Sequence, residues 1–143
     1  MSERNILVLC TGNSCRSQMA EAFIRRLAGE RFEVFSAGLE PAPEIHPLAL
    51  RVMDEIGEIM EGQHPKSVKT YLGRMGFRYV VFVCADAENS CPRIFPGVLN
   101  FVNLTVDDPA KAEGTQEERL EVFRRVRDEL HDKIERWVGT LDA

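Results

Sequence analysis

The sequence predicts a single α/β domain built on a four-stranded parallel sheet with helices on both faces. Short apolar runs alternate along the chain with segments of helical spacing, an order typical of parallel strands joined by covering helices. The chain also has 143 residues, an ordinary length for one domain. Its 44% hydrophobic and 29% charged residues are typical of a globular protein. We therefore expect residues 1–143 to form one domain with one core.

Four short apolar runs are expected to form the strands, and each ends at a turn or a polar residue. The expected ranges are 5–9, 32–37, 79–83 and 98–104. Cys10, Cys84 and Asp108 each follow one of these strands. Because the carboxyl ends of parallel strands meet at one edge of a sheet, we expect these three residues to surround one cleft.

The segments between the strands place their apolar residues at helical spacing. The first helix is expected to begin at Arg16 and to stop near Gly29. In the last helix, Thr115 and Glu118 form a capping-box pattern, and an apolar stripe then extends to Trp137. The other expected ranges are 46–59 and, for a short helix, 67–74.

The charge balance bears on partners and location. The net charge is −5, from 18 basic and 23 acidic side chains, which argues against nucleic acid or a membrane surface as the main partner. The start of the chain has no signal-peptide layout, and no apolar run has the length of a transmembrane helix. We expect a cytoplasmic monomer whose four cysteines are reduced at rest, so that they serve chemistry or metal binding.

Residues 10–17, here called the Cys10 loop, have the form C-x5-R-S between a predicted strand and a predicted helix. Successive amides of such a loop converge on its centre, and the first turn of the helix adds further donors. A tetrahedral oxyanion fits there, clamped by the guanidinium of Arg16. The candidate oxyanion-binding residues are Thr11, Gly12, Asn13, Ser14, Cys15 and Arg16.

The same field of donors would stabilise a thiolate, so we expect the pKa of Cys10 to fall below the value of about 8.5 of a free thiol. The hydroxyl of Ser17 can donate a further hydrogen bond to that sulfur. Gly12 and Asn13 suit the left-handed backbone angles that such a loop requires. Cys10 is therefore interpreted as a catalytic nucleophile.

Three residues have plainer interpretations. Cys10 could be a small buried hydrophobe at the end of a strand, but the setting of the motif favours the nucleophile. Cys15 could protect Cys10 as a neighbouring thiol, although simple packing is the favoured interpretation. For Asp108, Asp-Pro after a strand is common turn chemistry, and its spacing alone leaves that interpretation and an acid role equally open.

Residues 8–21, VLCTGNSCRSQMAE, closely resemble the opening of the thioredoxin-coupled arsenate reductases, which share the fold of the low-molecular-weight protein tyrosine phosphatases. The same resemblance extends to residues 36–38, 84–92, 107–109 and 123–129, so it covers essentially the whole chain. The first motif is shared with the phosphatases. The pair Cys84 and Cys91, followed by Pro92, is what separates the reductases from them.

The resemblance implies a mechanism. Cys10 attacks arsenate, for which phosphate and sulfate are analogues, and Asp108 protonates the leaving oxygen. Cys84 then attacks the sulfur of Cys10 and expels arsenite, and Cys91 attacks Cys84 in turn. Thioredoxin reduces the resulting disulfide. No tightly bound cofactor is implied.

The spacing of Cys84 and Cys91 constrains that relay. Seven residues of helix rise about 10 Å, whereas a disulfide joins Cα atoms about 5.5 Å apart. Residues 85–90 would therefore have to unwind or loop out when the two cysteines join. Zinc is a poor alternative, because no C-x2-C pair or neighbouring histidine completes a site. Burial alone is a credible interpretation of Cys84.

A monovalent cation lies near the loop in part of the reductase family. The resemblance places the matching residues at Asn13, Glu21 and Ser36. Where the family has a further carboxylate, this chain has Lys66. Its ammonium could take the place of the cation, or Lys66 could simply cap a short helix at the surface. No other metal site is expected.

Two alternative functions need different features. Hydrolysis of phosphate monoesters through a Cys10 phospho-enzyme requires only Cys10, Arg16 and Asp108, so weak phosphatase activity is expected in either case. The phosphatases carry aromatic residues after the Asp-Pro, whereas residues 110–112 here are Ala-Lys-Ala. A non-enzymatic redox or oxyanion sensor is the other alternative, but the sequence contains no recognisable DNA-binding or effector module.

Overall fold

The computed structural model describes residues 4–58, 60, 62–71, 73–85 and 100–141. Cys91 and residues 86–90, which are expected to unwind or loop out in the relay, lie outside this part of the chain. The strands are β1 (Asn5–Cys10), β2 (Glu33–Gly38), β3 (Tyr79–Phe82) and β4 (Asn100–Asn103). The helices are α1 (Arg16–Ala28), α2 (Pro47–Asp54) and α4 (Gln116–Val138), with 3-10 turns η2 (Val68–Thr70) and η3 (Pro109–Lys111).

The four described strands form one parallel sheet in the order β2-β1-β3-β4, as predicted. The chain passes from β1 to β2 on one side and returns to β3 on the other, so the strand order reverses between β1 and β3. In open α/β sheets this reversal opens a crevice at the carboxyl ends of the two strands. Cys10 ends β1, and Cys84 comes two residues after the end of β3.

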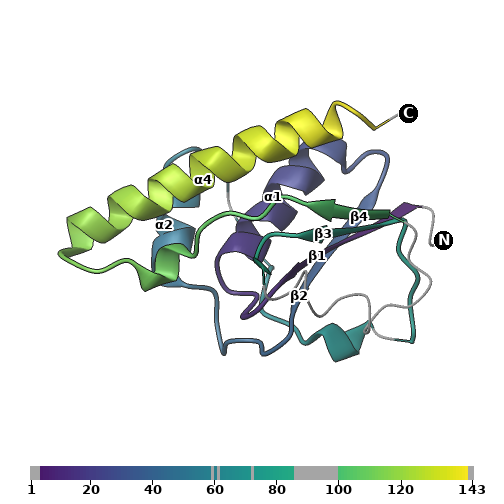
Figure 1. Cartoon of the computed structure of the whole chain (residues 1–143), viewed down its shortest axis with the longest axis horizontal. Helices are drawn as coiled ribbons and strands as arrows, with labels where there is room; N and C mark the ends of the chain where they lie inside the picture. Colours follow the sequence, from purple (N-terminus) through teal and green to yellow (C-terminus); the bar gives the residue numbers. More distant parts are fainter. Residues whose placement is uncertain (1–3, 59, 61, 72, 86–99, 142–143) are drawn as a thin grey trace.

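The two faces of the sheet are covered differently. Helices α1 and α4 lie on one side and η2 on the other (Figure 1). Neighbouring residues of β2 show the alternation, because successive side chains of a strand point to opposite faces. Ser36 hydrogen-bonds Glu21 of α1, whereas the ring of Phe35 packs edge-on against Tyr71 and Phe77.

Helix α4 matches its prediction closely. The capping box is present, with the Thr115 hydroxyl accepting from the amide of Glu118 at 3.1 Å and the Glu118 carboxylate accepting from the amide of Thr115 at 2.9 Å. The stripe is buried along the helix, and its fully buried members are Leu120, Phe123, Val126, Leu130 and Ile134. None of the described helices is long and apolar enough to cross a membrane.

Two helices are shorter than predicted. The expected helix 46–59 ends at Asp54, and Gly57 then turns the chain with φ of 78°. Apolar spacing continues in the sequence through Ile56 to Ile59, but the side chain of Ile56 is 45% exposed. The expected helix 67–74 is reduced to η2, and Gly73 follows it with φ of 74°. In both cases a left-handed glycine ends the helical backbone.

Candidate active site

The Cys10 loop turns its carbonyl groups outward. Every carbonyl of residues 10–15 accepts a hydrogen bond of 2.8–3.2 Å from outside that stretch. The donors, in order, are the amides of Leu39, Glu40 and Ala42, the side chain of Gln18, and the amides of His46 and Met19. The C=O and N–H of a planar peptide point in opposite directions. The amides therefore face the inside of the loop, and those of residues 12–15 have no acceptor among the described residues.

The backbone of the loop depends on one left-handed residue and one close approach. Asn13 has φ of 51°, as predicted, but Gly12 is not left-handed, so that part of the prediction was wrong. Instead, the essential glycine is Gly38, opposite Cys10 in the sheet. A Cβ on Gly38 would lie 2.6 Å from the carbonyl oxygen of Thr11 and 2.9 Å from the amide nitrogen of Asn13. The sequence signal was a glycine at the end of a strand.

Arg16 is fixed at the mouth of the loop rather than solvated. It is 9% exposed, and its Nη1 donates to the carbonyl of Val106 at 3.1 Å. Its Nη2 lies 3.6 Å from Oδ2 of Asp108. The buried Nε has no partner among the described residues. A guanidinium held this way can offer N–H groups to an anion in the loop.

A cleft of about 540 Å³ opens beside the loop. Its lining residues are Thr11, Arg16, Cys84, Ala85, Thr105, Val106, Asp107, Asp108 and Lys111. The predicted convergence of three strand ends is therefore confirmed. Cys10 lies behind this lining, 3% exposed, and its thiol hydrogen-bonds the thiol of Cys84. The hydroxyl of Thr11 is 3.5 Å from the Cys84 sulfur.

The two aspartates of the cleft have different surroundings. Asp108 faces Arg16 with one oxygen, and its other oxygen accepts from the amide of Ala110 at 3.0 Å, which caps η3. The turn interpretation of Asp108 is therefore confirmed, and the same side chain also lies beside Arg16. Asp107 is exposed and lies 3.9 Å from Arg125 at the surface. Asp108 is thus the carboxylate placed beside the Cys10 loop.

The pKa of Cys10 contradicts the prediction. The hydrogen bond with Cys84 raises the pKa of Cys10 most, and burial raises it further. Arg16 and the amide of Thr11 act in the opposite direction. The donors of the loop are present, but the neighbouring thiol of Cys84 outweighs them. The two sulfurs form an interacting pair, so their titration belongs to the pair rather than to either cysteine.

Ser17 and Cys15 are both buried within the Cys10 loop. The buried hydroxyl of Ser17 accepts from the side-chain amide of Asn13 at 2.7 Å. Within the described residues it makes no hydrogen bond to Cys10, which was the expected contact. Cys15 is 4% exposed, and burial raises its pKa to about 12. That burial supports packing rather than reactivity for Cys15.

The residues matched to a cation site do come together. Asn13 donates to Ser36 at 3.0 Å, and Ser36 donates to Glu21 at 2.5 Å. Arg25 is ion-paired with Glu21, its Nη2 lying 2.5 Å from the carboxylate. Burial lowers the pKa of Lys66, and the charge of Glu21 acts on that pKa in the opposite direction. Lys66 instead donates its ammonium to the carbonyl of His64, and η2 is capped by Ser67 rather than Lys66. Sequence reasoning missed Arg25, although Glu and Arg four residues apart on a helix are neighbours.

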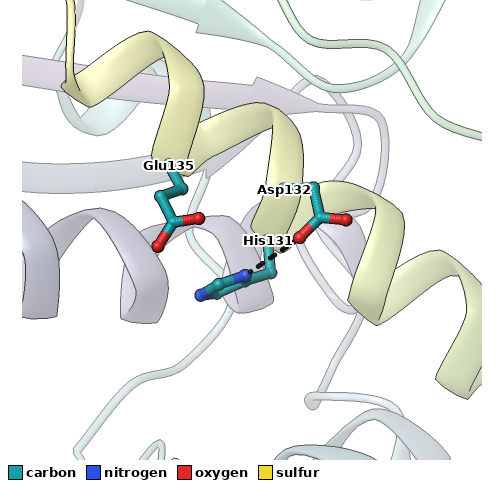
Figure 2. Close-up of side chains that lie close together, drawn as sticks. All are labelled: His131, Asp132 and Glu135. Carbon is teal, nitrogen blue, oxygen red and sulfur yellow. Dashed lines mark hydrogen bonds and ion pairs between the residues drawn. The ribbon is translucent and has the colours of Figure 1, made fainter.

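One further group of potential metal ligands lies away from the cleft. His131, Asp132 and Glu135 of α4 bring their ligand atoms within 4.8 Å of one another (Figure 2). However, Nε2 of His131 is 3.4 Å from Nη2 of Arg26, a permanent cation. The ring of His131 also packs edge-on against the buried ring of Phe23. These contacts describe a packed surface histidine, so the cluster carries no metal assignment.

The fold and the loop together define a class of protein. It is an α/β domain whose first strand and first helix flank a cysteine-arginine loop with inward-facing amides. The chain belongs to the family described as low molecular weight phosphotyrosine protein phosphatase, which matches residues 5–143.

Curated relatives extend over almost the whole chain. An arsenate reductase of Shouchella clausii is 43% identical over 140 residues, covering 98% of this chain and 99% of the relative. An arsenate reductase of Bacillus subtilis is 38% identical over 140 residues, with the same coverage.

Solved structures agree with the fold. An arsenate reductase in its oxidised state is 27% identical with a TM-score of 0.80, covering 97% of this chain and 99% of that one. The tyrosine phosphatase Wzb from Escherichia coli K30, in complex with sulphate, has a TM-score of 0.82 and the same coverage. At 24% identity it supports the fold alone.

Proposed function

We propose that this protein reduces arsenate to arsenite with Cys10 as nucleophile and Cys84 as the resolving thiol. The observation that carries the proposal is the contact between these two cysteines at the reversal point of the sheet. A hydrolase of this family needs one thiol in the loop, whereas a reductase needs a second thiol that can reach the first. The full-length relatives named arsenate reductase support the same choice.

The first step is the attack of the Cys10 thiolate on arsenic(V) in the Cys10 loop. An S–As bond forms, and one oxygen leaves as water after Asp108 supplies a proton. The amides of the loop and the guanidinium of Arg16 stabilise the negative charge on the remaining oxygens. Thr11, Gly12, Asn13, Ser14 and Cys15 contribute through their backbone, and Ser17 through its contact with Asn13.

The second step transfers electrons. The Cys84 thiolate attacks the sulfur of Cys10, the S–As bond breaks, and its electron pair reduces arsenic(V) to arsenic(III), which leaves as arsenite. A Cys10–Cys84 disulfide remains. Cys91 then attacks Cys84, releases the Cys10 thiolate, and forms a Cys84–Cys91 disulfide. We propose thioredoxin as the dithiol that reduces this disulfide and restores the starting state.

Phosphatase activity is the second candidate, favoured by the family and by the pairing of Arg16 with Asp108. Against it, the described residues of the cleft lining include no aromatic side chain that could bind a tyrosine ring. The described lining includes the cations Arg16 and Lys111, which suit an inorganic oxyanion. We expect slow hydrolysis of simple phosphate esters beside the main activity.

The deciding experiment follows arsenate-dependent NADPH oxidation through thioredoxin and thioredoxin reductase. Wild type, Cys84→Ser and Cys91→Ser are compared, with hydrolysis of p-nitrophenyl phosphate measured in parallel. We expect both variants to lose arsenate turnover while retaining ester hydrolysis. Cys15→Ser serves as the matched cysteine control and should remain active. Full arsenate turnover in either relay variant would refute the relay, and fast ester hydrolysis without arsenate reduction would identify a phosphatase.

A further inference from the structure

A short segment between α2 and η2, residues 63–67 and here called the strap, lies behind the Cys10 loop. The amide of Lys66 donates to the side-chain oxygen of Asn13 at 2.8 Å, and the carbonyl of Lys66 accepts from the amide of Gly38 at 2.8 Å. At the other end of the strap, the side-chain amide of Gln63 donates to both oxygens of Gln18, at 2.8 Å to Oε1 and 3.0 Å to the main-chain carbonyl.

Gln18 connects the strap to the loop. Its side chain is fully buried, and its Nε2 donates to the carbonyl of Asn13 at 2.9 Å. That carbonyl belongs to the same peptide unit as the amide of Ser14. Because the unit is planar and trans, holding the Asn13 oxygen outward aims the Ser14 N–H toward the centre of the loop. One buried amide therefore sets the direction of one of the donors offered to an oxyanion.

The orientation of the Gln18 amide is set by Gln63. A glutamine side chain has a donor end and an acceptor end, and reversing it exchanges the two. The main-chain carbonyl of Gln18 can only accept, which fixes the NH2 group of Gln63 toward it. The same NH2 group then requires the oxygen end of the Gln18 side chain, and so leaves the nitrogen end for Asn13. A reversed Gln18 side chain would place its oxygen against the carbonyl oxygen of Asn13.

We propose that Gln63 is a positioning residue for oxyanion binding: through Gln18 it fixes the direction of the Ser14 amide in the Cys10 loop. This inference rests on the proposed function only in requiring that the loop binds an oxyanion. Among the described residues, Gln63 makes no hydrogen bond to residues 10–17 and does not line the cleft, and it lies 45 residues from its partner in the sequence.

Two substitutions separate amide orientation from packing. Gln63→Glu keeps the size of the side chain but cannot donate a hydrogen bond. It therefore favours the reversed orientation of the Gln18 amide, in which the Gln18 oxygen faces the carbonyl oxygen of Asn13. Gln63→Leu removes the partner without favouring either orientation. Binding of inorganic phosphate and arsenate is measured by calorimetry, and the Ser14 amide is followed by ¹⁵N NMR during the phosphate titration. Relative to wild type, we expect the dissociation constants to rise about tenfold for Gln63→Glu and about threefold for Gln63→Leu.

The added charge of Gln63→Glu is controlled in two ways. Gln116→Glu, at an exposed glutamine of α4, should bind as wild type does. In a Gln18→Leu background, Gln63→Glu should weaken binding less than twofold, because the amide it acts through is gone. The phosphate-induced shift of the Ser14 amide should shrink in Gln63→Glu alone.

Results that contradict the role of Gln63 are also defined. Any one of three results would overturn the inference. The affinity could be unchanged in Gln63→Glu, or Gln63→Glu could cause the same loss in the Gln18→Leu background. The third is a greater loss of affinity in Gln63→Leu than in Gln63→Glu. Thermal melts confirm that each variant is folded. If wild type itself binds neither phosphate nor arsenate, it is the proposed function that fails rather than the role of Gln63.

Discussion

The guanidinium of Arg16 lies 3.6 Å from the carboxylate of Asp108, so the anion clamp and the proton donor of the proposed reaction are ion-paired across the cleft. An oxyanion in the loop would compete for the same guanidinium and weaken this pair. Binding of the substrate and the placement of Asp108 are thereby linked in one contact.

Arg16→Lys should abolish most activity while leaving the protein folded. Lysine keeps the positive charge but loses the planar fork that reaches Val106, Asp108 and the loop together. We expect kcat/KM for arsenate to fall by about 10²–10³, the range found when one oxyanion donor is removed. Steady-state kinetics check this. A loss below fivefold would show that charge alone suffices.

Asp108→Asn should lower kcat. Asparagine can still accept from the amide of Ala110 and cap η3, so the turn is preserved while the ionisable proton is lost. We expect kcat to fall by about 10²-fold, within the range for general acid catalysis. Asp107→Asn is the matched control and should leave kcat unchanged. Equal effects of the two substitutions would rule out the assignment of Asp108.

Gly38→Ala should destabilise the fold and distort the Cys10 loop. The added methyl would meet the main chain of Thr11 and Asn13, which cannot move aside as a flexible side chain would. We expect a loss of about 1–3 kcal/mol in the free energy of unfolding, measured by urea denaturation. In Gly12→Ala the new methyl meets its nearest atom at 3.6 Å, so a much smaller loss is expected. Equal losses would show that the close approach at Gly38 has no cost.

Arg25→Met should leave the carboxylate of Glu21 buried without its ion-pair partner. Because the Arg25 side chain is 49% exposed, water screens the pair, and we expect a loss of about 1–2 kcal/mol rather than the larger cost of a fully buried pair. Adding Glu21→Gln should recover part of the stability, since a neutral amide needs no counter-charge. Thermal unfolding of the single and double variants measures both. Additive losses would exclude coupling between Glu21 and Arg25.

Features that follow from local sequence patterns or sheet geometry were predicted, whereas features that depend on packing between distant segments were missed. The convergence of Cys10, Cys84 and Asp108 was predictable because parallel strands must place their carboxyl ends at one edge. The contact between Gln18 and Gln63 depends on how distant segments pack, which no local pattern reveals. Helix α2 was predicted too long because apolar spacing continued past the turn at Gly57.

The raised pKa of Cys10 has the same origin, because it comes from Cys84, which is distant in sequence. Removing that thiol should therefore make Cys10 more acidic. In Cys84→Ala the largest cause of the raised pKa is gone, while the lowering effects of Arg16 and the Thr11 amide remain. A lower pKa means a larger thiolate fraction at pH 7, so alkylation of Cys10 by iodoacetamide should be faster than in wild type.

The pH dependence of that alkylation in a Cys15→Ser background, followed by mass spectrometry of the Cys10 peptide, reports the pKa directly. The midpoint should move to lower pH in Cys84→Ala. Cys84→Ser keeps a hydroxyl that can donate to the Cys10 sulfur but carries no second thiol, so its midpoint should also fall below that of wild type. An unchanged midpoint in both variants would mean that burial, not the neighbouring thiol, controls the ionisation of Cys10.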